Sequence, residues 1–169
     1  RGVCRVDFGS WQELSEKTRQ WAERWFGGSK GAKEQPESLD IRFERGSQAG
    51  AEKQLEEYFA GERERFDLKI DLQGTPFQRK VWSALRTIAY GQTCSYKDIA
   101  ALIGKEKAVR AVGGANNRNP ISILVPCHRV IGRDGSLIGY GGGLHIKQTL
   151  LELEQKAAKL TSAKASSHL

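Results

Sequence analysis

Alternating apolar and polar positions predict strands in the first 72 residues. Residues 3–8 alternate in the manner of a half-buried strand, and residues 66–72 alternate more regularly than any other segment. A third, shorter strand is predicted over residues 40–43. The segment before it, residues 27–38, is rich in Gly, Ser, Lys and Glu, which predicts a loop.

Apolar residues at helical spacing predict two helices in the same region. Leu14, Trp21 and Trp25 are separated by seven and four positions, which favours a helix over residues 11–26. A second helix, over residues 51–59, has an apolar face made by Leu55, Tyr58 and Phe59. Residues 1–72 are therefore predicted to form a small α/β domain, with a boundary at Gln73-Gly74.

Three helices are predicted beyond this boundary, the first two from capping residues. Thr75, Pro76 and Gln78 make a helix start, and the helix is expected over residues 76–89, with its core face made by Phe77, Val81, Leu85 and Ile88. Ser95 opens a short helix over residues 96–103, which stops at Gly104. After a tight turn, a third helix is expected over residues 108–116. Two short helices around a Gly-containing turn are typical of a helix-turn-helix.

The end of the chain is predicted to be one more helix followed by a tail. The helix covers roughly residues 146–160, and residues 161–169 are expected to be disordered. The second domain is therefore placed at residues 73–160. No apolar run approaches the roughly 20 residues that span a bilayer, and no signal peptide is visible, so we expect a soluble cytoplasmic protein. Because the chain opens on Arg1 and contains no Met, we expect that N-terminal residues are missing.

Charge is distributed unevenly between the two parts. Residues 1–72 carry 13 Lys and Arg against 15 Asp and Glu, whereas residues 73–169 carry 14 against 5. All of the excess positive charge, within a net charge of +7, therefore lies in the second part. A basic region of this kind indicates a face that binds a polyanion such as nucleic acid. A solvated basic surface without a partner is the alternative.

The second helix of the helix-turn-helix is made of small residues. It contains Gly113 and Gly114, and each Gly costs about 1 kcal/mol in a helix relative to Ala. This cost suggests close approach, either to another helix or to a DNA backbone. Ala111 and the two glycines have no side-chain groups that could hydrogen-bond to the edges of the bases, so binding that tolerates different DNA sequences is favoured. Arg110 is the one long side chain at the start of this helix. The alternative is a packing helix with a solvated Arg.

One of the three cysteines has a chemical neighbour. Cys127 precedes His128, and a thiol beside a base becomes a strong nucleophile. Since neighbouring side chains in a strand point apart, the pair needs a turn or a bridging water, and Asn119-Pro120 supplies a turn signal. A third group should orient the imidazole, and the residues alone leave Asp134, Glu152 and Glu154 open. The alternative is a buried structural thiol, which is also our interpretation of Cys4 and Cys94. The spacing fits no zinc site.

Taken together, these motifs closely resemble the O6-alkylguanine-DNA alkyltransferases, also called methylated-DNA–protein-cysteine methyltransferases. The match runs from Gly74 to Glu154 and includes five blocks in order: Ser95-Tyr96, Arg110-Ala111-Val112-Gly113, Asn119-Pro120, Val125-Pro126-Cys127-His128-Arg129-Val130 and Gly139-Tyr140-Gly141-Gly142-Gly143. The arrangement looks most like the constitutive bacterial form.

The resemblance implies an α+β fold, in which a small ribonuclease-H-like α/β domain precedes a mostly helical domain with the helix-turn-helix. It implies stoichiometric transfer of an alkyl group from O6-alkylguanine, and from O4-alkylthymine, in double-stranded DNA to a protein cysteine. The damaged base would be flipped out through the minor groove. We expect a monomer, with no cofactor, no metal and no membrane partner, associated with the nucleoid of a prokaryotic cell.

The resemblance also implies roles for individual residues. Cys127 matches the alkyl acceptor, His128 its base acting through a water, and Glu154 the acid that orients His128. Tyr96 matches a tyrosine that rotates the nucleotide and donates a proton, and Asn119 matches a hinge residue. Arg110 matches the arginine that fills the gap left by the flipped base. The remaining assignments are Ala111, Gln78 and Arg133 on the DNA-binding surface, and Val130, Tyr140, Gly141 and Gly142 at the base pocket.

Two departures from the family bear on these expectations. Vertebrate members hold zinc in the first domain, but residues 1–72 contain one Cys and no His, so that site is not expected. The chain also begins one strand late, which would leave the sheet of the first domain with an unpaired edge. Because Gly141 and Gly142 are small, we expect an open pocket that tolerates alkyl groups larger than methyl.

Two proteins of other classes would share some of these motifs. A non-catalytic DNA-lesion sensor resembles this family but lacks the cysteine, and Cys127 argues against it. A helix-turn-helix regulator with an incidental thiol would need side chains that read sequence on the second helix, where Ala111, Gly113 and Gly114 are poor ones.

Overall fold

The structure, a computed structural model, describes residues 2–27 and 49–166. Helices dominate this part of the chain, and a single two-stranded sheet accompanies them. In order, the elements are α1 (Trp11–Phe26), α2 (Ala49–Phe59), α3 (Pro76–Leu85), β1 (Cys94–Ser95), α4 (Tyr96–Leu102), the 3-10 turn η1 (Glu106–Ala108), α5 (Val109–Asn117), the 3-10 turn η2 (Cys127–Arg129), β2 (Val130–Ile131) and α6 (Leu144–Ser166). No described helix is both long and apolar enough to cross a membrane.

Three of the helices begin at the predicted residues, two of them at caps that the sequence indicated and α1 at a Ser10 cap that it did not. Ser10, Thr75 and Ser95 each accept a hydrogen bond from the backbone N–H three residues on, and the side chain at that third position bonds back to the cap. Each cap satisfies amide groups that a helix start leaves without a partner. The predicted starts of α1, α3 and α4 are therefore confirmed.

Helix α3 ends earlier than predicted. Its last helical residue is Leu85, four residues before the expected end, and the chain continues as turns. Thr87 donates its hydroxyl to the Ala84 carbonyl at 2.8 Å, and the Ile88 N–H bonds to Leu85 instead of continuing the helical pattern. These local bonds compete with the helix, as hydroxyl side chains often do.

The predicted strands of the first domain are present only as isolated contacts. Val3 pairs with Ile70, and Val6 pairs with Ile121, each as a single parallel bridge. The prediction of a regular strand over residues 66–72 was wrong, because the backbone–backbone bonds from this segment to other described residues are two bonds with Val3, at 2.8 and 2.9 Å. The predicted loop and strand at residues 28–43 lie outside the described residues. The ribonuclease-H-like topology therefore stays a prediction.

The core lies between α3, α4, α5 and the start of α6. Helix α5 packs against both α3 and α4, and the α4–η1–α5 unit has the order predicted for the helix-turn-helix. Trp82 is the largest buried side chain, and its indole N–H donates to the Ala115 carbonyl at 2.8 Å. Gly74 makes room for this ring, since a Cβ there would lie 2.3 Å from it.

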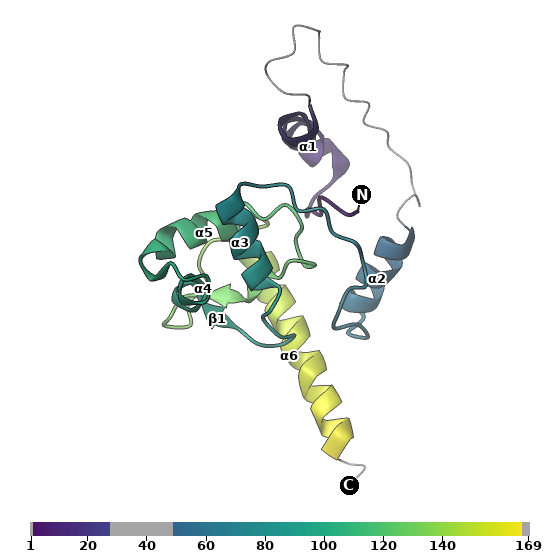
Figure 1. The fold of residues 1–169 in the computed structure, drawn as a ribbon. Helices are drawn as coiled ribbons and strands as arrows, with labels where there is room; N and C mark the ends of the chain where they lie inside the picture. The colour runs from purple at the N-terminus through teal and green to yellow at the C-terminus, as the bar shows by residue number, and fades with distance from the viewer. Residues whose placement is uncertain (1, 28–48, 167–169) are drawn as a thin grey trace, which may run out of the picture.

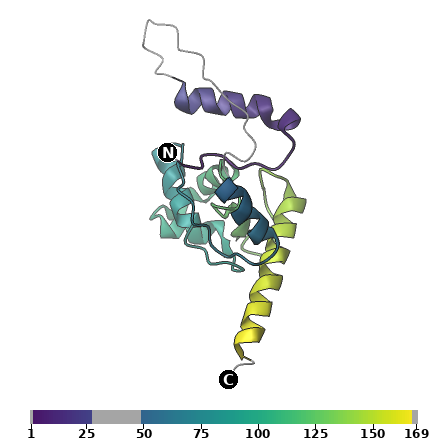
Figure 2. The same ribbon diagram turned by 90° about the vertical axis from the view of Figure 1, so that its right-hand side faces the viewer.

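Figures 1 and 2 place α1 at one end of the molecule, α3–α5 in the middle and the C-terminal half of α6 at the other end. Helix α6 begins two residues before the predicted start and continues to Ser166. Residues 161–166 are therefore helical rather than a disordered tail. Only the first part of α6 reaches the core, through Lys147, Leu150, Leu151 and Glu154.

Candidate active site

The tight turn η2 carries Cys127 and follows a fully buried segment. Every residue from 121 to 130 is buried, and the Cys127 N–H bonds to the Val125 carbonyl at 2.8 Å. Ile123 has a φ of 70°, a left-handed conformation that is strained for a β-branched residue. The turn predicted for the Cys127-His128 pair is thus present, and packing on all sides holds it.

Asn119 organises this turn and contacts the thiol. Its side-chain N–H2 donates to Cys127 Sγ at 3.0 Å and to the Val125 carbonyl at 2.8 Å, while its oxygen accepts from the Ile121 N–H at 3.0 Å. Asn116 adds a bond at 3.3 Å to the Cys127 carbonyl. Two amide side chains that precede η2 therefore fix the position of the sulfur.

Burial keeps the Cys127 thiol protonated. The residue is only 3% exposed, and this desolvation raises the pKa of the thiol above its ordinary value. The hydrogen bond from Asn119 and the positive charge of Lys147 act in the opposite direction, since both favour a thiolate. A nearby base is therefore needed to take the thiol proton at neutral pH.

His128 and Glu154 form a buried pair beside this thiol. Nε2 of His128 lies 2.7 Å from Oε1 of Glu154, and both side chains are fully inaccessible to solvent. Arg129 donates to both carboxylate oxygens, at 2.8 and 2.9 Å, and the Tyr58 hydroxyl donates at 2.7 Å. Burial alone would raise the pKa of Glu154, but the bonds from His128 and Arg129 lower it to about 2. Glu154 is therefore an ionised acceptor.

This arrangement fixes the form of the His128 ring. Burial, the largest effect, lowers the pKa of His128, so the imidazole is neutral. An ionised Glu154 only accepts hydrogen bonds, so Nε2 carries the ring proton. Nδ1 is then the basic nitrogen, and it has no hydrogen-bond partner among the described residues. His128 is poised to accept a proton.

Of the three acids left open by the sequence, only Glu154 contacts His128. Asp134 bonds instead to the backbone and hydroxyl of Ser136, and Glu152 bonds to Gln148 on the surface of α6. The resemblance had selected the same residue.

Three residues of this site were not predicted. Arg129 and Tyr58 hold Glu154, and Lys147 donates to the carbonyls of Val130 and Ile138 at 2.6 and 2.8 Å. A signal for Lys147 was available, because Lys147, Leu150, Leu151 and Glu154 recur at helical spacing and share the buried face of α6. Charged residues on such a face indicate partners inside the core. Tyr58 left no comparable signal, since it comes from a distant helix.

Lys147 lies close to Tyr96, the predicted proton donor, and its charge acts on the Cys127 thiol. Its Nζ lies 5.9 Å from the centre of the Tyr96 ring, and burial lowers the pKa of its ammonium to about 8. The Tyr96 hydroxyl donates to the Ile138 carbonyl at 2.9 Å, which is also a Lys147 acceptor. Burial, assisted by the Cys127 sulfur, raises the pKa of Tyr96, so the phenol stays protonated.

A cavity of about 90 Å³ opens onto Cys127. Tyr140, Gly141 and Gly142 line it, as predicted for the base pocket, whereas Tyr96 and the buried Val130 are not part of its lining. Asn116, Asn117, Asn119 and Ser122 complete the inner wall. Burial raises the pKa of Tyr140 so that it remains a neutral phenol. The cavity thus has the Cys127 thiol and neutral hydrogen-bonding side chains in its wall, while His128 lies outside its lining.

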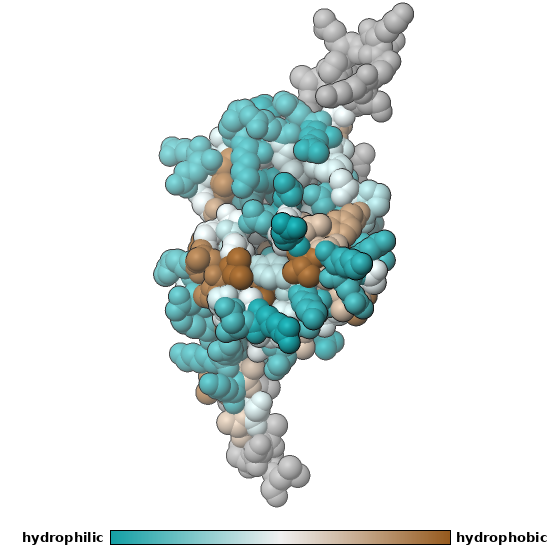
Figure 3. Space-filling model, turned by 90° about the vertical axis from the view of Figure 1, so that its left-hand side faces the viewer, coloured by the Kyte–Doolittle hydropathy of each residue, from teal (hydrophilic) through white to brown (hydrophobic). Residues whose placement is uncertain are grey.

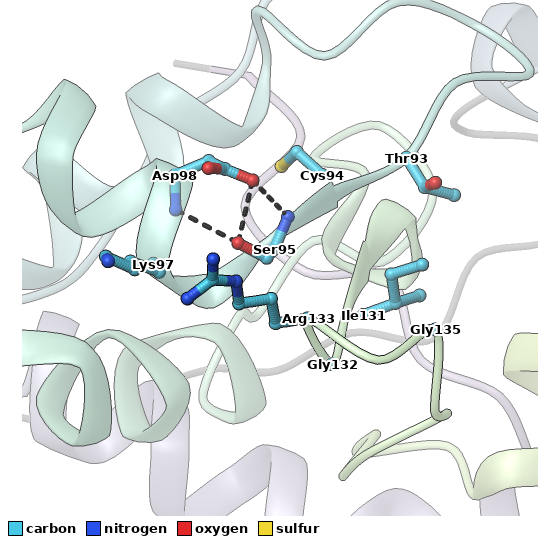
Figure 4. A pocket seen from close by; sticks show the side chains of 9 residues that line it. All are labelled: Thr93, Cys94, Ser95, Lys97, Asp98, Ile131, Gly132, Arg133 and Gly135. Carbon is cyan, nitrogen blue, oxygen red and sulfur yellow. Dashed lines mark hydrogen bonds between the residues drawn. The ribbon is translucent and has the colours of Figure 1, made fainter.

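The residues predicted to contact DNA come from several elements. Arg110 and Ala111 are exposed at the start of α5. Arg133 is exposed beside the Ser95–Asp98 cap at the start of α4 (Figure 4). Gln78 is partly engaged, because its side chain completes the Thr75 cap. The face on which α4 and α5 lie has a hydrophobic band between hydrophilic areas (Figure 3).

This arrangement suits nucleophilic attack by sulfur. A buried thiol held by Asn119, a neutral imidazole with a basic nitrogen and an ionised carboxylate behind it are the parts that activate a cysteine. The exposed start of a small-residue helix provides a surface for a polyanion.

Comparisons with known proteins agree with this chemistry. The profile of the family described as 6-O-methylguanine DNA methyltransferase, DNA binding domain, matches residues 76–156. A methylated-DNA–protein-cysteine methyltransferase from Mycolicibacterium paratuberculosis is 62% identical over 64% of this chain and 66% of its own length. The constitutive Bacillus subtilis protein of that name is 56% identical over 66% of this chain and 68% of its own. The chain therefore spans about two thirds of the length of these curated relatives.

A solved structure gives the same result for the fold. The crystal structure of Mycobacterium tuberculosis OGT in complex with DNA has a TM-score of 0.64 and 59% identity, over 64% of this chain and 68% of that one. This chain therefore shares the fold of that protein over about two thirds of its length. On its sequence, its fold and the arrangement around Cys127, this chain belongs to the methylated-DNA–protein-cysteine methyltransferase family.

Proposed function

We propose that this protein repairs DNA by moving an alkyl group from the O6 atom of guanine, and from the O4 atom of thymine, to Cys127. The observation that carries the proposal is the buried Cys127 thiol, bonded to Asn119 and adjacent to the His128–Glu154 pair. The names of the relatives and the DNA complex of the M. tuberculosis protein support it.

The reaction follows from the protonation states of the site. The Cys127 proton passes to Nδ1 of His128, through a bridging water, and the thiolate attacks the alkyl carbon from the side opposite O6. A carbon–sulfur bond forms as the carbon–oxygen bond breaks, and its electron pair stays with the guanine. Tyr96, a protonated phenol, supplies the proton that the departing base needs and regains one from the surroundings. In sum, the thiol hydrogen is exchanged for the alkyl group.

We propose a single turnover for each molecule. The product is a thioether, which water does not cleave under mild conditions. Within the described residues, the other two thiols, Cys4 and Cys94, do not line the Cys127 cavity. Without a second thiol at the site, the alkyl group stays on the protein and inactivates it.

DNA engagement is assigned to α5. Its exposed start, with Arg110 and Ala111, would enter the minor groove of a double helix, and Arg110 would fill the gap left by the flipped base. Arg133 and Gln78 would contact the strand on either side. The protein would act as a monomer bound to DNA of the bacterial nucleoid, and a ribonuclease-H-like first domain would support this half.

The direct test is a transfer assay with excess duplex DNA that contains O6-methylguanine. Mass spectrometry should find one added methyl group on the peptide that holds Cys127, and none in the Cys127→Ser variant. A count well above one methyl per protein would refute the single turnover. Binding without any transfer would point instead to a non-catalytic lesion sensor.

A second test separates the role of Arg110 from the chemistry. Arg110→Ala should slow repair of duplex DNA several-fold and leave the reaction with free O6-methylguanine unchanged. Only in the duplex does flipping of the damaged base leave a gap in the base stack for Arg110 to fill. The matched control is Arg118→Ala, in which another exposed arginine at the opposite end of α5 is removed. Equal slowing on both substrates would contradict the gap-filling role.

A further inference from the structure

The outer wall of the Cys127 cavity is made by the N-terminal segment. Four of the residues that line this cavity come from positions 7 to 17, namely Asp7, Phe8, Leu14 and Lys17. The motifs that identified the site all lie between residues 74 and 154, so none of them includes this wall. The cavity is therefore a joint product of the two parts of the chain.

Backbone bonds attach this segment directly to the active-site turn. The Val6 N–H donates to the Pro120 carbonyl at 2.9 Å, and the Ser122 N–H donates to the Val6 carbonyl at 3.1 Å. Phe8 follows two residues later, so its position is tied to the segment that carries Asn119 and Ser122. Gly9, with a φ of 135°, then redirects the chain, and the Ser10 cap starts α1. Leu14 and Lys17 reach the cavity from that helix.

The Phe8 ring occupies the space that small residues leave in the opposite wall. Its centroid lies 6.4 Å from that of Tyr140, with the rings tilted by 54°. A Cβ added to Gly142 would lie 3.1 Å from the Tyr140 ring and 3.2 Å from the Phe8 ring. The small size of Gly142 therefore does not leave the pocket open, as its residue type suggested, because two aromatic rings close over it.

We propose that Phe8 sets the size of the alkyl group that reaches Cys127. This inference rests on the proposed alkyl transfer and names the residue that limits its substrates. Phe8 lines this cavity of about 90 Å³ together with Cys127, and its ring lies against Tyr140 and Gly142. A benzyl group has six more carbon atoms than a methyl group, so it should gain more than methyl does when the Phe8 ring is removed from this wall.

The experiment compares two substrates in one duplex sequence. Second-order rate constants for transfer from O6-benzylguanine and O6-methylguanine are measured for the wild type, Phe8→Ala and Phe8→Leu, and the benzyl-to-methyl ratio is calculated for each. We expect the ratio to rise about tenfold or more in Phe8→Ala and less in Phe8→Leu, since a few methylene volumes in a pocket change selectivity by this order. Because a lower fraction of active protein reduces both rate constants equally, it does not change their ratio.

Phe26→Ala is the matched control. Phe26 is also an aromatic residue of the N-terminal segment, but it is exposed, contacts Trp21 and does not line the cavity. Its ratio should equal that of the wild type. Thermal unfolding of each variant checks folding, and Phe8→Leu keeps the test decisive if Phe8→Ala does not fold.

The outcomes separate this inference from the proposed function. A wild type that transfers methyl, together with unchanged ratios in both Phe8 variants, would overturn the role of Phe8 and leave the function intact. A wild type that transfers neither group would overturn the proposed function itself. A ratio that rises equally in Phe26→Ala would attribute the effect to general loosening of the segment and would also overturn the role of Phe8.

Discussion

At Cys127, burial and reactivity make opposite demands. A buried thiol resists ionisation, yet the thiolate is the nucleophile. The sulfur stays buried, and groups that stabilise a thiolate lie around it. Asn119 donates a hydrogen bond to it at 3.0 Å, and the positive charge of Lys147 lowers its pKa. These groups favour the thiolate only once a proton acceptor such as His128 removes the proton.

Removing the Asn119 side chain should make the thiol less reactive. In Asn119→Ala the pKa of Cys127 should rise further, because the hydrogen bond that favours the thiolate is lost while the burial remains. A bond to a charged group contributes about 1.5–3 kcal/mol, so alkylation by iodoacetamide at pH 8 should slow by about tenfold or more. The rate is followed on the Cys127 peptide as a function of pH. Asn117→Ala is the control, and an unchanged pH midpoint in Asn119→Ala would contradict this account.

Glu154 should contribute stability that acid removes. The pKa of its carboxyl is about 2 in the folded protein, below its ordinary value of 4.5. The folded state therefore binds this proton less tightly than the unfolded state, so the added stability is complete above pH 4.5 and is lost as pH falls toward 2. Glu154→Gln should lower the free energy of unfolding at pH 7 by about 3 kcal/mol, because Arg129 is left buried without a counter-charge.

Urea unfolding of Glu154→Gln between pH 3 and pH 7 tests this expectation. The variant should lose less stability on acidification than the wild type. Glu152→Gln, which removes an exposed carboxylate two residues away on α6, should match the wild type within about 0.5 kcal/mol. Parallel pH dependence in the wild type and Glu154→Gln would show that the low pKa is not a source of stability.

Residue types in the sequence indicated the reactive pair but not everything that holds it. Cys127 and His128 are adjacent, so their chemistry could be recognised directly. The residues alone left Glu152 and Glu154 open, and the resemblance selected Glu154, which the structure places on the buried face of α6. Tyr58 could not be assigned, because its bond to Glu154 joins residues 96 positions apart, and local patterns carry no information about such a pair.

Among the elements, α5 contains glycines that the fold itself does not require. A Cβ at Gly113 would meet only the Tyr96 ring at 3.8 Å, and one at Gly114 would meet only the mobile end of Arg118 at 3.2 Å. Packing against another helix is therefore not the reason for either glycine. Close approach to DNA, the second explanation suggested by the sequence, stays a prediction.

Gly114→Ala should separate stability from DNA binding. The variant should be more stable by up to about 1 kcal/mol, because Ala is the better helix residue and the Arg118 side chain can move aside. Its affinity for duplex DNA should fall several-fold if the helix approaches the backbone closely. Thermal unfolding and a titration with labelled duplex measure the two effects. A variant with unchanged affinity would remove the DNA explanation for Gly114.

Elements defined by local signals were predicted best. The α1, α3 and α4 starts depend on caps within three residues, and all three are correct. The strand expected over residues 66–72 depends on partners elsewhere in the chain, and its alternating pattern said nothing about whether they pair. Sequence periodicity describes which face an element buries, but not what lies against that face.

On the scale of the whole molecule, the Cys127 site is assembled from distant parts of the chain. Phe8, Tyr58, Cys127 and Glu154 come from the N-terminal segment, α2, η2 and α6. Each of the helices can form locally, whereas the contact of Val6 with Pro120 and Ser122 joins the beginning of the chain to its last third. Contacts of such separation close large loops and form slowly.

The bridge between Val6 and Ile121 therefore has a consequence for folding. After dilution from urea, helical circular dichroism should recover before Cys127 becomes protected against iodoacetamide, because protection needs the closed wall. Simultaneous recovery of both signals would show that the N-terminal wall of the cavity closes as the helices form.

If the helices form first, each newly made molecule passes through a stage in which its DNA-binding helices are folded and the Cys127 thiol is still accessible to small reagents. During that interval any small electrophile in the cell, rather than damaged DNA, could consume it.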